Sequence, residues 1–124
     1  MKKEDNHLRR KKDFEITFAD GYMVSGNLLM LKHCPIDPLR HPKRGLSKSD
    51  LKIAFAVSVK ISKSAVVRNR TRRIIREALR LAMQEKEIKT GHYLVFIAKN
   101  GAEKCKMMEI KTEVEMLLKK ARLV

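Results

Sequence analysis

The spacing of apolar residues predicts that the first half of the chain forms a short helix followed by three short strands. In residues 8–20, apolar side chains recur among charged ones with helical spacing, and Gly21 is a typical stop signal after them. Residues 22–32 are typical of two extended segments joined by a tight turn at 25–27. Apolar alternation in residues 51–59 predicts a third strand, which we expect to be buried.

The second half is predicted to contain a helix, a strand and a helix. The strongest helical pattern runs from about 64 to 86, and the Ser64 hydroxyl can accept a hydrogen bond from a backbone N–H of the first turn. Residues 92–99 are short, apolar and rich in β-forming side chains. The apolar residues within 104–122 recur at helical spacing and form one stripe, which predicts a final helix. All three prolines lie in residues 34–51, which predicts a mobile loop there.

This order predicts an α+β fold in which a small sheet carries packed helices. The chain has 124 residues, of which 44% are hydrophobic, so we expect one domain over 1–124 with a modest core. A basic head at 1–10 is expected to be flexible. By default, the strand-helix-strand unit would cross over with right-handed connectivity.

Charge narrows the class of partner. The chain carries 29 Lys plus Arg against 14 Asp plus Glu, a net charge of +15, which favours nucleic acid first and an anionic membrane second. No signal peptide or apolar stretch of membrane length is visible, and we expect a cytoplasmic protein. Cys34 and Cys105 stand far apart without a CxxC partner, which favours reduced thiols over a disulfide or a zinc site. No nucleophilic triad, paired-carboxylate site or phosphate loop is present, and no protein-bound metal or cofactor is predicted.

The long predicted helix separates into two faces when it is projected at roughly 100° per residue. Solvated helix faces usually mix charges of both signs, whereas residues 60–80 hold eight Lys or Arg and a single acid. We therefore expect this face to bind phosphates rather than only water, and arginine suits forked hydrogen bonding to phosphate. The polar face spans an arc of about 140° and carries Arg68, Asn69, Arg72, Arg73, Arg76 and Arg80.

Two features leave alternatives open. Asn69 could cap the helix, bond to a phosphate or a 2′-hydroxyl, or orient a hydrated metal ion, and its position does not choose among these roles. Phe14 and Phe18 lie four residues apart and share a helix face. They could pack in the core, which the residues alone favour, or stack on unpaired bases beside Arg10 and Lys11.

The segment AFAVSVKISKSAVVRNRTRRIIREALR, residues 54–80, resembles the signature of the bacterial ribonuclease P protein component. The segment LRRKKDFEITFADG, residues 8–21, is similar to that family's first helix. Order and spacing agree from about Leu8 to Ala98. Where family members commonly have two lysines, an apolar residue and Gly, this chain reads KISK at 60–63. The resemblance implies a single α/β sandwich with a left-handed β-α-β crossover, opposite to the default expectation.

The resemblance also implies an RNA-binding subunit that helps a catalytic RNA remove the 5′ leader from precursor tRNA by binding the leader and by improving the affinity for metal ions. The RNA would carry the chemistry with magnesium ions that it holds itself, and no obligatory protein partner or membrane is implied. Carried over by position, the residues that contact the catalytic RNA would be Lys60, Arg68, Asn69, Arg70, Arg72, Arg73 and Arg76. The leader-binding cleft would be lined by Phe14, Phe18, Arg10, Lys11, Lys32, Val57 and Val59.

Two other classes remain to be distinguished. A non-catalytic RNA-binding or RNA-chaperone module, such as a small ribosomal protein, would share the charge but have no leader cleft. A helix-turn-helix DNA-binding protein is less favoured because no second short helix precedes the arginine-rich helix.

Overall fold

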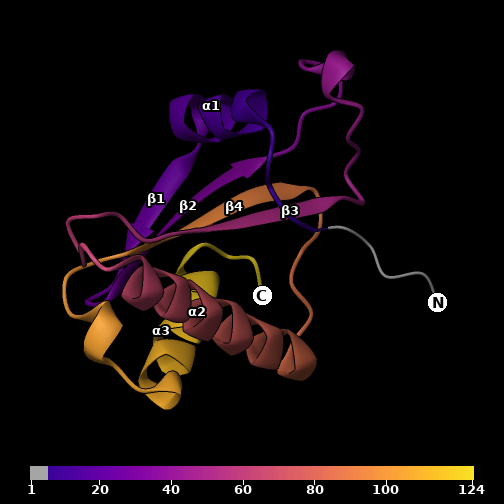
Figure 1. Cartoon of the computed structure of the whole chain (residues 1–124). Coiled ribbons are helices and arrows are strands. Elements are labelled where there is room, and N and C mark those ends of the chain that lie inside the picture. Colours follow the sequence, from indigo (N-terminus) through magenta and orange to yellow (C-terminus); the bar gives the residue numbers. More distant parts are fainter. Residues whose placement is uncertain (1–5) are drawn as a thin grey trace.

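The computed structural model describes residues 6–124, in which four strands form one mixed sheet with helices on both faces (Figure 1). The spatial order of the strands is β1-β2-β4-β3. The β1–β2 and β2–β4 pairs are antiparallel, and β3 runs parallel to β4. The strands are β1 (Tyr22–Ser25), β2 (Leu29–Pro35), β3 (Leu51–Ala56) and β4 (His92–Ala98).

Helix α1 (Lys11–Asp20) covers one face of the sheet, while α2 (Ala65–Glu85) and α3 (Met107–Lys120) cover the other (Figure 1). Two short 3-10 helices, η1 (Pro42–Arg44) and η2 (Ala102–Lys104), lie in the connections. The parallel neighbours β3 and β4 are joined through α2, as the predicted strand-helix-strand unit requires. The predicted α+β class and element order are confirmed.

Strand β4 divides the core into two parts because successive side chains of a strand point to opposite faces. Leu94 and Phe96 belong to the larger cluster, which fills the space between the sheet and the pair α2 and α3. Tyr93 and Val95 belong to a smaller cluster on the α1 side, together with Ile16 of α1. The central strand is therefore buried on both faces, which explains its nearly continuous apolar sequence.

Helix ends follow the local signals. The Val67 N–H donates to the Ser64 hydroxyl oxygen at 3.3 Å, which confirms Ser64 as the N-cap of α2. After α1, the Gly21 N–H donates to the Thr17 carbonyl at 3.0 Å. A Cβ at Gly21 would lie 2.3 Å from the Thr17 carbonyl oxygen and 2.7 Å from that of His33. Glycine is required there because the last turn of α1 and strand β2 both lie too close for any side chain.

The turn between β1 and β2 is closed by a side chain from the far end of the chain. The carboxylate of Glu113 on α3 is buried, and it accepts hydrogen bonds from the N–H groups of Asn27 at 3.1 Å and of Leu28 and Leu29 at 2.5 Å. A Cβ at Gly26 would lie 2.7 Å from this carboxyl group. The predicted turn at 25–27 thus depends on a long-range contact as well as on its own residues.

Several element bounds differ from those expected. Helix α1 begins at Lys11 rather than at residue 8, because residues 6–8 run along β3 instead. The Leu8 N–H donates to the Ile53 carbonyl at 2.9 Å, the Ile53 N–H donates to the Asn6 carbonyl at 2.6 Å, and Leu8 is buried. This part of the head is therefore anchored, and residues 1–5 lie outside the described residues. Strand β3 ends at Ala56 rather than at residue 59, and β2 continues through Pro35 into the segment expected to be loop.

Candidate RNA-binding surfaces

Helix α2 presents arginine side chains to solvent because its opposite face is buried against the sheet and α3. Thr71 is an unexpected member of that buried face, and its hydroxyl donates to the Val67 carbonyl at 2.8 Å. Arg68 and Arg72 lie half-buried at the border of the face. The exposed polar residues of α2's first four turns are Asn69, Arg70, Arg73, Arg76 and Arg80.

Three arginines of α2 are held in position by neighbouring groups. The Arg68 Nη1 donates to the Ser62 carbonyl at 2.9 Å, and the Arg72 guanidinium donates to the Asn69 Oδ1. The Arg76 guanidinium lies 5.6 Å from the ring centroid of Phe55, a cation–π distance. Their charges are therefore oriented before any partner binds, and Asn69 acts on an arginine of its own helix.

The positive charge of this face is poorly compensated. The Arg80 Nε donates to both carboxylate oxygens of Glu77 at 2.8 and 3.0 Å, and this hydrogen bonding lowers the pKa of Glu77. Arg70 and Arg73 form no ion pair with any residue in 6–124. Lys60 is exposed in the connection that precedes α2. The arrangement can bind a run of phosphates, and the guanidinium groups of Arg70 and Arg73, which pair with no acid in residues 6–124, can donate hydrogen bonds to them.

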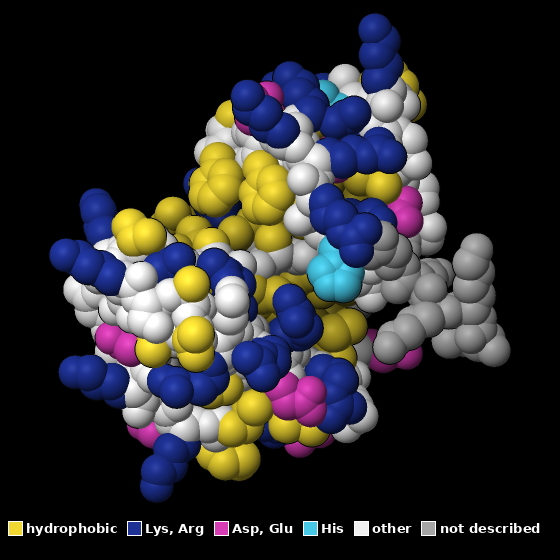
Figure 2. All heavy atoms as spheres, in the orientation of Figure 1, with side chains coloured by type: hydrophobic (Ala, Val, Ile, Leu, Met, Phe, Trp, Pro, Cys, Tyr) yellow, Lys and Arg dark blue, Asp and Glu magenta, His cyan; other side chains and the backbone are white. Residues whose placement is uncertain are grey.

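An apolar hollow lies between α1 and the sheet. Figure 2 shows hydrophobic side chains gathered beneath the upper part of the molecule, with Lys and Arg side chains around them. Phe18 is 47% exposed, whereas Phe14 is half-buried. Phe14, Ala54, Ala56 and Ile97 all pack against the smaller core cluster and are only partly buried themselves. The expected core role and an exposed aromatic surface therefore coexist in this pair of rings.

Three of the predicted cations border the hollow. Lys32 lies opposite Val95 in the β2–β4 register, so it shares the sheet face that α1 covers. Arg10 is the N-cap residue of α1 and Lys11 is its first residue, and both are exposed. The structure thus brings together cations and aromatic rings from α1 and the sheet.

Val57 is a correction to the expected cleft. Its side chain is 5% exposed and belongs to the larger cluster beneath α2 and α3, so it faces away from α1. Val59 is 64% exposed in the connection after β3 and lies beyond the sheet. The floor is formed instead by Ala54 and Ala56, whose parity along β3 is opposite to that of Val57. The alternation in IAFAVSV predicts that odd-numbered and even-numbered residues of this strand face opposite sides of the sheet. It does not indicate which of the two sets faces α1.

Residues 6–124 hold neither a metal centre nor a membrane-spanning helix. That part of the chain places no three His, Cys, Asp or Glu side chains so that they could hold a metal ion. None of its helices combines the length and hydrophobicity needed to cross a bilayer. Cys34 and Cys105 are free thiols, and Cys34 is buried.

Comparison with known proteins agrees with this geometry over almost the whole chain. The sequence profile of the ribonuclease P family matches residues 1–122. The ribonuclease P protein component of Clostridium botulinum strain 657 is 35% identical over 118 residues, covering 95% of this chain and 96% of the relative. That of Nostoc punctiforme is 34% identical over 131 residues, covering 94% and 91%.

Solved structures show the same fold. The Staphylococcus aureus RNase P protein superimposes with a TM-score of 0.76 at 21% identity, covering 97% of this chain and 98% of that one. The Thermotoga maritima protein gives 0.72 at 20% identity, covering 94% and 97%. Because both the sequence match and the fold extend over almost the whole chain, this chain belongs to the ribonuclease P protein family.

Proposed function

We propose that the chain binds two RNA molecules at once: the RNA component of ribonuclease P through α2, and the 5′ leader of precursor tRNA through the hollow beside α1. Family membership makes it the protein component of a ribonucleoprotein endoribonuclease that works with an RNA component in 5′-leader processing. The RNA carries the chemistry, with magnesium ions that it holds itself, and the complex works in the cytoplasm. The protein contributes binding and orientation, not a catalytic group.

The observation that carries the first contact is the uncompensated arginine charge on α2. Arg70 and Arg73 have no acidic partner among the described residues, while Arg68 is tied in place by the Ser62 carbonyl. Like charges on one helix face repel each other, so this face lowers the stability of the free protein. An RNA backbone relieves that repulsion, and guanidinium groups bind phosphate oxygens through paired hydrogen bonds.

The leader contact is supported by exposed aromatic surface next to cations. Single-stranded RNA is bound most simply by rings that stack on bases and by Lys or Arg side chains that follow the backbone. The half-exposed ring of Phe18 supplies the first element, and Lys11 and Lys32 supply the second. Such a site tolerates different leader sequences because every base has a face that can stack.

Reconstitution with a bacterial-type catalytic RNA at low magnesium tests the function as a whole. The affinity of the assembled complex is measured for precursor tRNA and for the same tRNA without its leader, and the rate of leader removal is measured with and without the protein. We expect the protein to accelerate leader removal and to raise affinity mainly for the leader-bearing RNA. Equal affinity for both RNAs, with no acceleration, would favour the RNA-chaperone alternative.

The α2 contact is tested separately with the double variant Arg70→Ala and Arg73→Ala. For every phosphate that the variant no longer binds, the dependence of log affinity on log salt should flatten by about 0.7 to 0.9. A matched control, Lys104→Ala with Lys119→Ala, removes the same charge from two exposed positions near the ends of α3. If both double variants flatten the slope for the RNA component equally, α2 is not a specific contact.

A further inference from the structure

A second basic surface lies on the other flank of α1 from the hollow. At roughly 100° per residue, Lys12 is about 160° around the helix axis from Phe14 and about 120° from Phe18. Lys12 lines a groove of about 380 Å³ between α1 and the connection from β2 to β3. The other lining residues are Arg40, His41, Pro42, Lys43 and Arg44. None of the lining side chains is acidic.

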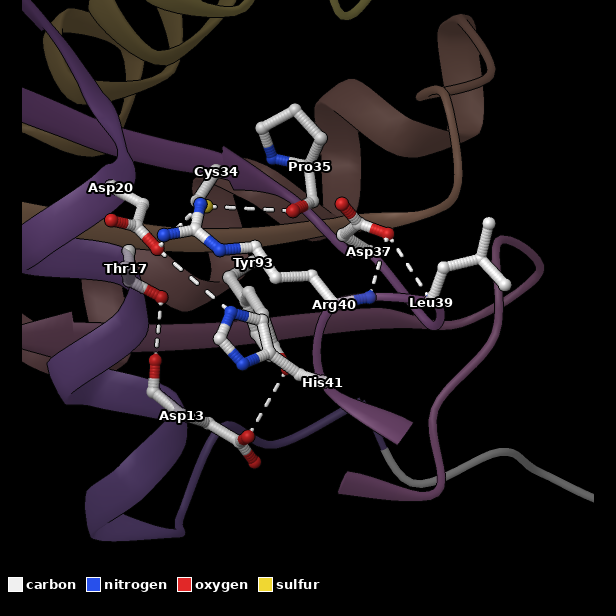
Figure 3. Close-up of polar contacts among 10 residues, drawn as sticks. All are labelled: Asp13, Thr17, Asp20, Cys34, Pro35, Asp37, Leu39, Arg40, His41 and Tyr93. Atoms are coloured by element: carbon white, nitrogen blue, oxygen red, sulfur yellow. Dashed lines mark hydrogen bonds and ion pairs between the residues drawn. The ribbon is translucent and has the colours of Figure 1, made fainter. Parts of the chain in front are cut away.

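The connection that forms this groove is anchored to α1 by ion pairs. The Arg40 Nη1 lies 3.3 Å from the Asp20 carboxylate, and the His41 Nε2 lies 3.9 Å from the same oxygen (Figure 3). The Arg44 Nη1 lies 3.6 Å from the buried Asp13 carboxylate. Leu46 packs against the smaller core cluster, so the segment is fixed at both ends of η1. The groove is thus a built surface with a defined shape.

The acids of the connection itself do not line the groove, and their carboxylates accept hydrogen bonds from the loop backbone instead of pairing with its cations. The Asp37 Oδ1 accepts hydrogen bonds from the Leu39 and Arg40 N–H groups at 3.2 Å (Figure 3). The Asp50 Oδ2 accepts one from the Ser47 N–H at 2.8 Å. Lys12 and Lys43 form no ion pair with any described residue. Two lysine ammonium groups therefore remain for an external anion.

We propose that this groove binds phosphates of the same leader, at nucleotides farther from the tRNA body than those in the hollow. The proposal rests on the function proposed above. Both surfaces belong to α1, a helix about 15 Å long, and the exposed Arg10 and Lys11 at its first turn lie between them. A strand that leaves the hollow around this end of α1 passes Lys11 and Lys12 before it reaches Lys43.

The position of the groove favours the leader over the RNA component. Helix α2 covers the opposite face of the sheet from α1 (Figure 1). An RNA bound along α2 would have to pass around the whole sheet to reach η1, whereas a single strand in the hollow is already beside α1. A flexible chain of phosphates also fits an open groove of lysine and arginine, which offers no apolar pocket for a base.

Leader length supplies the experiment. The complex of the full chain and a bacterial-type catalytic RNA is assayed with two precursors that share one tRNA body. One leader is only long enough to reach the hollow, and the other is extended by single-stranded nucleotides. For the double variant Lys12→Ala and Lys43→Ala we expect roughly tenfold weaker binding of the extended precursor near 0.1 M salt, with a salt slope flatter by about 1.4. Binding of the short precursor should stay within about twofold of the wild type.

The control variant Lys104→Ala with Lys119→Ala should leave both precursors unaffected. Equal weakening for the short and extended leaders would overturn the proposal, because the groove would then contact the tRNA body or the RNA component. No weakening for either leader would overturn it as well. Failure of the proposed function looks different, because the wild-type complex itself would then not distinguish leader-bearing from mature tRNA. Both lysines are exposed and form no ion pair within residues 6–124, so urea unfolding should show an unchanged free energy of unfolding.

Discussion

The Tyr93 hydroxyl on β4 donates a hydrogen bond to the Asp13 carboxylate on α1 at 3.1 Å, and both side chains are buried. Burial, and then the negative charge of Asp13, raises the pKa of Tyr93 above its ordinary value, so the hydroxyl keeps its proton. The same carboxylate receives Arg44 from the β2–β3 connection. One buried group therefore joins α1 to the sheet and to the loop, with the hollow on one side and the basic groove on the other.

Replacing Asp13 should destabilise the protein. Asp13→Ala leaves the Tyr93 hydroxyl buried without an acceptor and Arg44 without its carboxylate. We expect the free energy of unfolding in urea to fall by about 1–3 kcal/mol. Tyr93→Phe leaves the Asp13–Arg44 pair in place and should cost about 1 kcal/mol. Glu15→Ala, at an exposed position of the same helix, is the control. If Glu15→Ala lowers the free energy of unfolding as much as Asp13→Ala does, the buried Asp13 contacts do not contribute specifically to stability.

The two phenylalanines of α1 should separate stability from leader binding. Phe14 is half-buried against the core, so Phe14→Ala should lower both the free energy of unfolding and the affinity for leader-bearing RNA. Phe18 is 47% exposed, so Phe18→Ala should weaken leader binding by about 1–3 kcal/mol and leave the unfolding midpoint nearly unchanged. The measurement is the difference in affinity between precursor and mature tRNA, together with urea unfolding. Loss of stability without loss of leader affinity in Phe18→Ala would contradict the stacking role.

The β1–β2 turn should depend on Glu113. Glu113→Ala leaves three backbone N–H groups without their carboxylate, and hydrogen bonds to a charged group are worth about 1.5–3 kcal/mol each. We expect a loss of at least about 2 kcal/mol in the free energy of unfolding. Amide hydrogen exchange should become faster at Leu28 and Leu29. Glu115→Ala is the matched control, since it removes only a partly exposed ion pair with Lys111. Unchanged exchange at the turn in Glu113→Ala would contradict the anchoring role.

His33 should make stability depend on pH. Partial burial, followed by the charges of His92 and Lys32, lowers the pKa of His33 in the folded protein. Below the ordinary value of about 6.5, the unfolded chain then binds more protons than the folded one, so stability falls as pH drops. Between pH 7 and 5, Tm should therefore fall less in His33→Gln than in the wild type. The control variant is His7→Gln, at an exposed position. An equal fall in Tm for the wild type and His33→Gln would contradict the prediction.

The elements were predictable because each rests on neighbouring residues. The separation of apolar and arginine faces in 66–82 is a property of consecutive positions, and it located α2 within a residue or two at each end. The Ser64 cap was equally local. The first helix was predicted too long because Leu8 has the right spacing for a helix but pairs beside Ile53, far along the chain. No local pattern distinguishes those two ways of burying one leucine.

The candidate sites also combine features that the sequence predicts with features that only the folded molecule decides. The arginines of α2 and their shared face follow from periodicity, since helix geometry alone places residues three and four apart together. Their charge predicts a polyanionic partner and no more than that. Which parity of β3 meets α1 was decided only in the folded molecule, and this removed Val57 from the hollow and placed Ala54 and Ala56 there. The docking of the β2–β3 connection on Asp13 and Asp20 was likewise invisible in sequence. Periodicity and charge act between near neighbours, whereas strand facing and loop docking depend on contacts between segments that only the completed fold brings together.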